Sequence, residues 1–114
     1  MGEVALAVPI LPGKKSAFEE LCRALQGPKV REVREANRRH GVDKETWFLQ
    51  SGPQGDMCIV YWEAAASTKP MEIFVKSQDP FDLWLKSELE KVTGIDFNDP
   101  PPLDFPKQVL RSGF

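Results

Sequence analysis

The sequence predicts an α+β domain in which a four-stranded antiparallel sheet carries helices on one of its faces. Two observations lead to this prediction. Some segments alternate apolar and polar residues with the period of two that strands require, whereas others repeat their apolar residues at the helical period. These segments follow one another in the order strand, helices, strand, strand, helices, strand. The chain of 114 residues has the length of a single domain, residues 1–114.

The amino-terminal part of the chain predicts one strand and two helices. The first strand is indicated by four alternating apolar residues, Val4, Leu6, Val8 and Ile10. Ser16 and Glu19 have the spacing of a capping box, and Gly27 ends the helix that they begin. A second helix is expected from Lys29 to His40.

Two further strands are expected from Lys44 to Ser51 and from Met57 to Glu63, joined by a loop rich in glycine. The second of these strands is apolar on both sides, with Met57, Ile59 and Tyr61 on one and Cys58, Val60 and Trp62 on the other. The expected helices are sufficient to cover one face of the sheet. We therefore expect a second copy of the chain to cover the other face.

The carboxy-terminal part predicts two more helices and a last strand. Pro70 opens a short helix, and Pro80 opens a longer one with Asp82 in its first turn, near the positive end of the helix dipole. The proline-rich segment 96–106 is expected to be irregular. Lys107 to Arg111 is expected to form the short fourth strand of the sheet, with Gln108 and Leu110 on one side and Lys107, Val109 and Arg111 on the other.

This order of elements is the split β-α-β pattern of a ferredoxin-like sheet. With its two-faced strands and its proline-rich approach to the last strand, the chain resembles the dimeric α/β barrel superfamily over nearly its whole length. It is similar in architecture to antibiotic-biosynthesis-type monooxygenases, and it most resembles the uncharacterised bacterial families of that superfamily. The resemblance implies a sheet-to-sheet homodimer and a pocket that holds a small hydrophobic or aromatic molecule.

Five residues are candidates for that pocket. Tyr61 and Glu63 would supply polar groups beside Trp62, and Trp47 lies on the neighbouring strand. His40 is the only histidine, so any role that requires an imidazole falls to it. Each candidate also has a structural interpretation: aromatic residues on strands are typical of a core or an interface, and His40 suits the end of a helix, where it interacts with the dipole.

Three classes of function are consistent with the sequence. The first is a protein that binds a small hydrophobic or aromatic molecule. The second is a cofactor-independent monooxygenase or isomerase that acts on a small aromatic substrate, and the third is an interaction module without a ligand. His40, Cys22 and Cys58 offer too few ligands at these spacings for a zinc site, so we expect neither a metal nor a cofactor.

The composition of the chain indicates which kinds of partner and which cellular compartment to expect. The net charge of −2 gives no general attraction to nucleic acids. No apolar run approaches the roughly 20 residues that span a bilayer, so membrane insertion is not expected. Cys22 and Cys58 fall at predicted core positions of different elements, which favours free thiols in a reducing compartment. We therefore expect a cytoplasmic protein.

Overall fold

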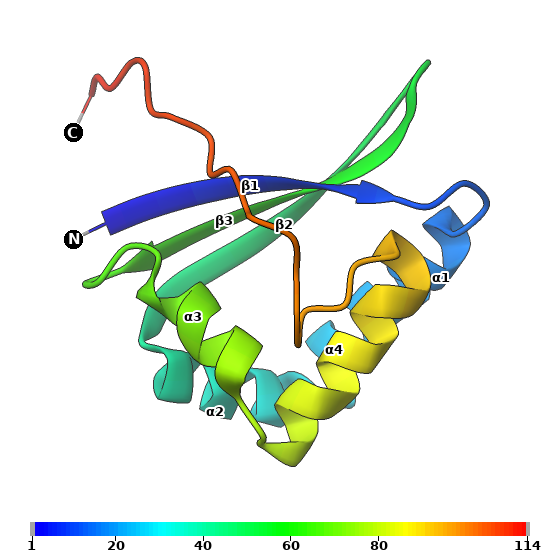
Figure 1. Ribbon diagram of the computed structural model, residues 1–114, viewed down its shortest axis with the longest axis horizontal. Helices are drawn as coiled ribbons and strands as arrows, with labels where there is room; N and C mark the ends of the chain where they lie inside the picture. Colours follow the sequence, from blue (N-terminus) through cyan, green and yellow to red (C-terminus); the bar gives the residue numbers. More distant parts are fainter. Residues whose placement is uncertain (1, 114) are drawn as a thin grey trace.

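The computed structural model describes residues 2–113, which form a sheet with helices on one face (Figure 1). The sheet consists of β1 (Gly2–Ile10), β2 (Val42–Gly52) and β3 (Gly55–Ala64) in the order β1-β3-β2. The central strand β3 pairs antiparallel with both neighbours. The α+β class is therefore as predicted, but the four-stranded sheet is wrong, because the sheet of the described residues has three strands.

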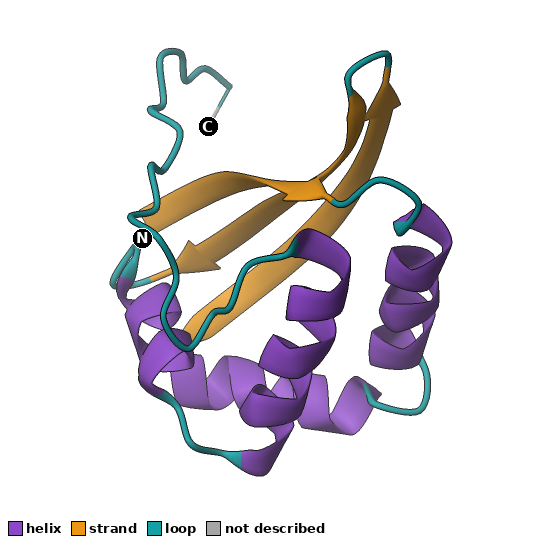
Figure 2. Cartoon of the chain, turned by 45° about the vertical axis from the view of Figure 1, so that its right-hand side comes forward, coloured by secondary structure: helices purple, strands orange, loops and turns teal. Residues whose placement is uncertain are grey.

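In residues 2–113, four helices cover one face of the sheet. α1 (Lys15–Gln26) and α2 (Val30–His40) connect β1 to β2, and α3 (Lys69–Lys76) and α4 (Pro80–Thr93) follow β3 (Figure 2). The predicted capping box at the start of α1 is absent, since the cap position is Lys14 and no side chain bonds there. α4 does have a capping side chain, because Asp79 accepts a hydrogen bond of 2.9 Å from the Phe81 amide. In the described residues no helix combines the length and the apolar character needed to cross a lipid bilayer.

The strand register decides which side chains meet the helices. Val4 pairs with Trp62, Leu6 with Val60 and Val8 with Cys58, and directly paired residues project from the same face of a sheet. These residues line the face that the helices cover. In β2 the register shifts between Val42 and Lys44, so that Asp43 is an extra residue in a β-bulge.

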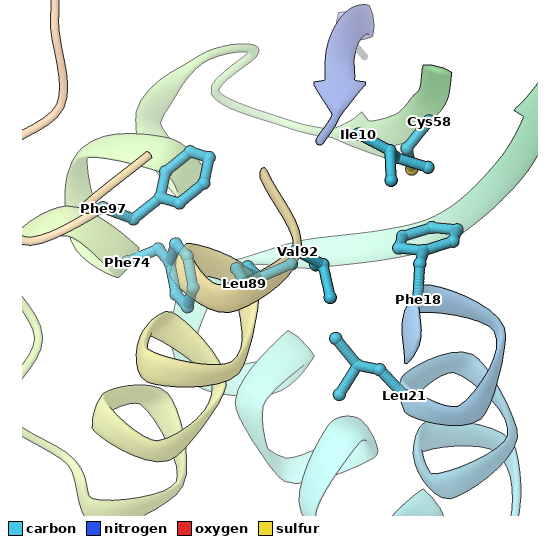
Figure 3. Packing of buried hydrophobic residues seen from close by; sticks show 8 residues of the cluster. All are labelled: Ile10, Phe18, Leu21, Cys58, Phe74, Leu89, Val92 and Phe97. Carbon is cyan, nitrogen blue, oxygen red and sulfur yellow. The ribbon is translucent and has the colours of Figure 1, made fainter. Parts of the chain in front are cut away.

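The core lies between this covered face and the helices. Its main cluster draws on α1, α3, α4, two strands and the segment after α4 (Figure 3). The eight buried members are Ile10, Phe18, Leu21, Cys58, Phe74, Leu89, Val92 and Phe97. Figure 3 shows Phe74 beside Phe97, and their ring centroids are 6.1 Å apart. Burying each large side chain stabilises the fold by about 1.5–3 kcal/mol.

The carboxy-terminal segment after α4 forms no strand. Lys107 to Arg111 was predicted as the fourth strand, but it is irregular, and Val109 and Leu110 are 86% and 80% exposed. Figure 1 shows this segment passing β1 and continuing beyond the sheet. Side-chain contacts join it to the sheet: the Phe105 ring meets Trp62 edge-on at 6.0 Å, and Arg111 forms an ion pair of 3.0 Å with Glu3. The predicted barrel of paired four-stranded sheets is therefore wrong.

Candidate ligand-binding site

A cavity of about 490 Å³ lies between the covered face of the sheet and the helices. All three strands, all four helices and Phe97 contribute to its wall. We call it the main cavity. Its volume is within the roughly 300–1,000 Å³ typical of small-molecule sites, and such sites combine apolar walls with a few polar groups. Among its apolar residues are Val8, Phe18, Cys58, Met71, Phe74 and Leu89.

Two tryptophans form part of the cavity wall, and both are among the site residues predicted from the sequence. Trp47 projects from β2 and stacks on Phe18 of α1, with ring centroids 6.1 Å apart and an interplanar angle of 14°. Trp62 projects from β3, and its indole nitrogen donates a hydrogen bond of 2.7 Å to the Ser67 carbonyl. Both rings are thus fixed in orientation and present apolar surface to the cavity.

Glu45 adds a carboxyl group to the same wall. Trp47 Nε1 donates a hydrogen bond of 2.7 Å to Glu45 Oε2. Glu45 is an exposed residue, although many protein atoms surround its carboxyl group. Burial raises the pKa of the Glu45 carboxyl, although the bond from Trp47 and the nearby His40 act in the opposite direction.

His40 lines the main cavity at the end of α2 and is held there by a buried carboxylate. His40 Nε2 lies 2.9 Å from Asp82 Oδ2, and Asp82, on α4, is 0% exposed. Gly41 follows in the left-handed conformation with φ of 79°, which lets the chain leave the helix directly after His40. His40 is therefore a buried, oriented imidazole rather than a solvated residue at a helix end.

Asp82 is held by three side chains. Arg39 Nη2 donates to Asp82 Oδ1 at 2.9 Å, and Ser77 Oγ donates to Asp82 Oδ2 at 2.6 Å, beside the His40 contact. We call Arg39, His40, Ser77 and Asp82 the Asp82 cluster. Burial alone would raise the pKa of Asp82, but the hydrogen bonds from Ser77, His40 and Arg39 outweigh it, and the pKa is lowered. The carboxylate is therefore ionised at neutral pH.

Lys86 is a second buried charge next to the Asp82 cluster. It is 1% exposed, and its Nζ donates to the carbonyl oxygens of Ser77 at 2.9 Å and Val75 at 3.1 Å. Burial lowers the pKa of the Lys86 ammonium group, opposed by the negative charge of Asp82. Through these two hydrogen bonds, the Lys86 ammonium group connects α4 to the backbone at the end of α3.

Both cysteines also line the main cavity. Burial raises the pKa of the Cys58 thiol to about 12, and it raises the pKa of the Cys22 thiol as well. A thiol is a nucleophile only as the thiolate. Neither cysteine is therefore suited to nucleophilic chemistry at neutral pH.

Tyr61 and Glu63 lie on the other face of the sheet, away from the main cavity. The Tyr61 hydroxyl lies 2.7 Å from Glu63 Oε2 and 2.9 Å from Glu3 Oε2, so its one hydrogen is placed between two carboxylates. The hydrogen bond to Glu63 is the main cause that raises the pKa of Tyr61, and burial and Glu3 add to it. The structure thus brings together three of the five predicted residues, His40, Trp47 and Trp62, and separates them from Tyr61 and Glu63.

Asp82 and Glu45 were not among the predicted site residues. Asp82 was expected only as a first-turn helix residue, since its contact with His40 joins positions 42 apart in the sequence. Glu45 had a local signal, because it lies two residues before Trp47 and must share its face within a strand. In residues 2–113 no three His, Cys, Asp or Glu side chains gather in an arrangement that would hold a metal ion.

Comparison of the chain with protein-family models, curated proteins and solved structures finds no match. The class of protein is therefore defined by the fold and the cavity alone: a small α+β domain with an apolar cavity beneath a three-stranded sheet.

Proposed function

We propose that the protein binds a small hydrophobic or aromatic molecule in the main cavity. The observation that carries this proposal is the cavity itself, about 490 Å³ in volume and lined mostly by apolar side chains. A well-packed core of this size has few voids larger than a water molecule. The main cavity is much larger than a water molecule, so ordinary packing does not account for it. A bound small molecule would fill this space.

The polar groups on the wall indicate what kind of molecule fits. His40 and Glu45 border the cavity, while the tryptophans and Phe74 supply flat apolar surface. A ligand with an aromatic or alicyclic body and one carbonyl or hydroxyl group would match both parts of this wall. We use 2-tetralone, a bicyclic aromatic ketone, as the probe of that class.

The test is calorimetric titration of the protein with 2-tetralone, supported by saturation-transfer NMR. Ala36 is buried on α2 and lines the cavity, so Ala36→Leu fills part of the volume. We expect this variant to bind at least tenfold more weakly, which corresponds to about 1.4 kcal/mol. The control is Ala17→Leu, an equal increase in size at an exposed position of α1 outside the cavity wall, which leaves the affinity unchanged. Equal affinity in the wild type and Ala36→Leu refutes binding in the main cavity.

We also propose that a second copy of the chain covers the exposed face of the sheet. Phe48 is 55% exposed there, and Met57 and Ile59 lie beside it across the β2–β3 pair. Large exposed apolar surface of this kind is typical of an interface. For the compartment we propose the cytoplasm, which the two free thiols support.

A further inference from the structure

We propose that His40 is a general base that removes a proton from the carbon next to a carbonyl group of a ligand in the main cavity. The protein would then be an acid–base enzyme, such as an isomerase that moves a proton within an apolar carbonyl compound. This inference rests on the proposed ligand binding. It goes beyond it, because a binding protein needs no oriented base.

The geometry of the His40 ring carries the proposal. Asp82 contacts Nε2 at 2.9 Å, and a carboxylate there accepts the Nε2 hydrogen. The neutral ring then has an unprotonated Nδ1. In residues 2–113 every fully buried side-chain nitrogen and oxygen has a hydrogen-bond partner, and the described contacts of the His40 ring nitrogens involve Nε2 alone. Nδ1 therefore keeps accessible surface, and His40 lines the main cavity.

The support behind the ring is built to hold one orientation. Asp82 is fully buried, and it also accepts hydrogen bonds from Ser77 Oγ at 2.6 Å and from Arg39 Nη2 at 2.9 Å. On its other side the His40 ring packs edge-on against Phe74, with centroids 5.7 Å apart. An imidazole fixed by a buried carboxylate in this way presents its second nitrogen as a proton acceptor. Asp82 is thus the positioning residue of His40.

Glu45 provides the complementary group on the same wall. In the proposed step the bond between the ligand's α-carbon and its hydrogen breaks, and the proton passes to His40 Nδ1. The electron pair forms the carbon–carbon double bond of an enolate and shifts negative charge to the carbonyl oxygen, to which the Glu45 carboxyl group, when it carries a proton, would donate a hydrogen bond. His40 then returns the proton to the same carbon, or to another carbon of the conjugated system. No electrons are gained or lost overall.

Hydrogen–deuterium exchange tests this step directly. 2-Tetralone has exchangeable hydrogens beside its carbonyl group, and proton NMR in D₂O follows their replacement. We expect the wild type to accelerate the exchange and His40→Gln to lower the protein-dependent rate at least 100-fold. Calorimetry should show that 2-tetralone still binds to His40→Gln. Arg38→Gln, at an exposed residue of the same helix, should exchange at the wild-type rate.

The outcomes separate the two proposals. Binding of 2-tetralone to the wild type without accelerated exchange overturns the general base and leaves ligand binding in place. Exchange that is unchanged in His40→Gln also overturns the general base. Failure of the wild type to bind 2-tetralone overturns both.

The role of Asp82 has its own readout. In Asp82→Asn we expect the ¹⁵N shifts of the His40 ring to move from a single tautomer with hydrogen on Nε2 to a mixture, together with slower exchange. Ser77→Ala removes one support of Asp82 and serves as a milder variant where Asp82→Asn does not fold. A His40 tautomer that is unchanged in both variants overturns the positioning role.

Discussion

At the scale of single residues, Asp82 is the side chain on which most of the buried polar contacts depend. It is 0% exposed and receives hydrogen bonds from Arg39 and Ser77 beside its contact with His40. Weakening the Asp82 carboxylate leaves the buried His40 ring without its charged partner, and such a loss is costly inside a protein. We expect Asp82→Asn to lower the free energy of unfolding at pH 7 by about 3 kcal/mol, measured by urea denaturation.

The lowered pKa of Asp82 also predicts a pH dependence. The folded-state pKa lies below the ordinary value of 3.8, so between the two the unfolded chain binds a proton that the folded protein does not. The stabilisation is therefore present above the ordinary pKa and is lost as the pH falls through the folded-state value.

The measurement is a series of urea denaturations from pH 6 downward. The slope of stability against pH in the acid range should be smaller in Asp82→Asn than in the wild type. Asp104→Asn, at an exposed carboxylate outside the cluster, should keep the wild-type slope. Identical slopes in the wild type and Asp82→Asn would contradict the assignment of this pH dependence to Asp82.

The residues of the candidate site differ in how far the sequence could predict them. His40 and the two tryptophans were predictable because histidine and tryptophan are rare in this sequence. Each of these residues also lies in a segment that the sequence predicts as a helix or a strand. Asp82 was not, because its partner His40 comes close only when α2 packs near α4. Tyr61 and Glu63 were named with the others because the sequence shows which strand residues share a face, but not which face the helices cover.

At the scale of elements, the carboxy-terminal segment is where prediction and structure differ. Lys107 to Arg111 is only five residues long, and its two apolar residues, Val109 and Leu110, are neighbours, so the sequence does not distinguish a strand from an irregular segment there. The longer strands and helices repeat their periods several times, and each was correctly predicted as a strand or a helix. A short segment of this kind forms a strand when one set of its side chains is buried. Val109 and Leu110 are both exposed.

The structure predicts that this segment contributes little stability. A chain that ends at Pro106 loses the exposed Arg111–Glu3 ion pair, and surface pairs contribute at most about 1 kcal/mol. We expect the free energy of unfolding to fall by less than about 1 kcal/mol. Phe105→Ala should lower it by about 1–2 kcal/mol, because that ring packs against Trp62. Thermal and urea denaturation of both variants would measure this, and a larger loss from truncation than from Phe105→Ala would contradict it.

At the scale of the whole molecule, the layered arrangement covers the sheet on one side only (Figure 2). We expect the wild type to sediment at twice the chain mass, with the exposed face at the interface. Ile59→Lys places a charge in the middle of that face and should give a folded monomer in analytical ultracentrifugation. Ala17→Lys adds the same charge at an exposed position of α1 and should stay dimeric. A wild type that sediments as a monomer at all concentrations would contradict the proposed homodimer.

The β-bulge at Asp43 lies at the start of β2. Val42 pairs with Ala64 on the covered face, yet Lys44, two positions later, pairs with Glu63 on the exposed one. Beyond the bulge, Glu45 and Trp47 reach the cavity while Phe48 faces outward. Without that residue, Lys44 would follow Val42 directly, and the same pairs with Ala64 and Glu63 would belong to a regular strand that keeps Glu45 on the covered face. The bulge therefore accommodates one additional residue at the start of β2, while the pairing that holds the cavity wall in place continues unchanged beyond it.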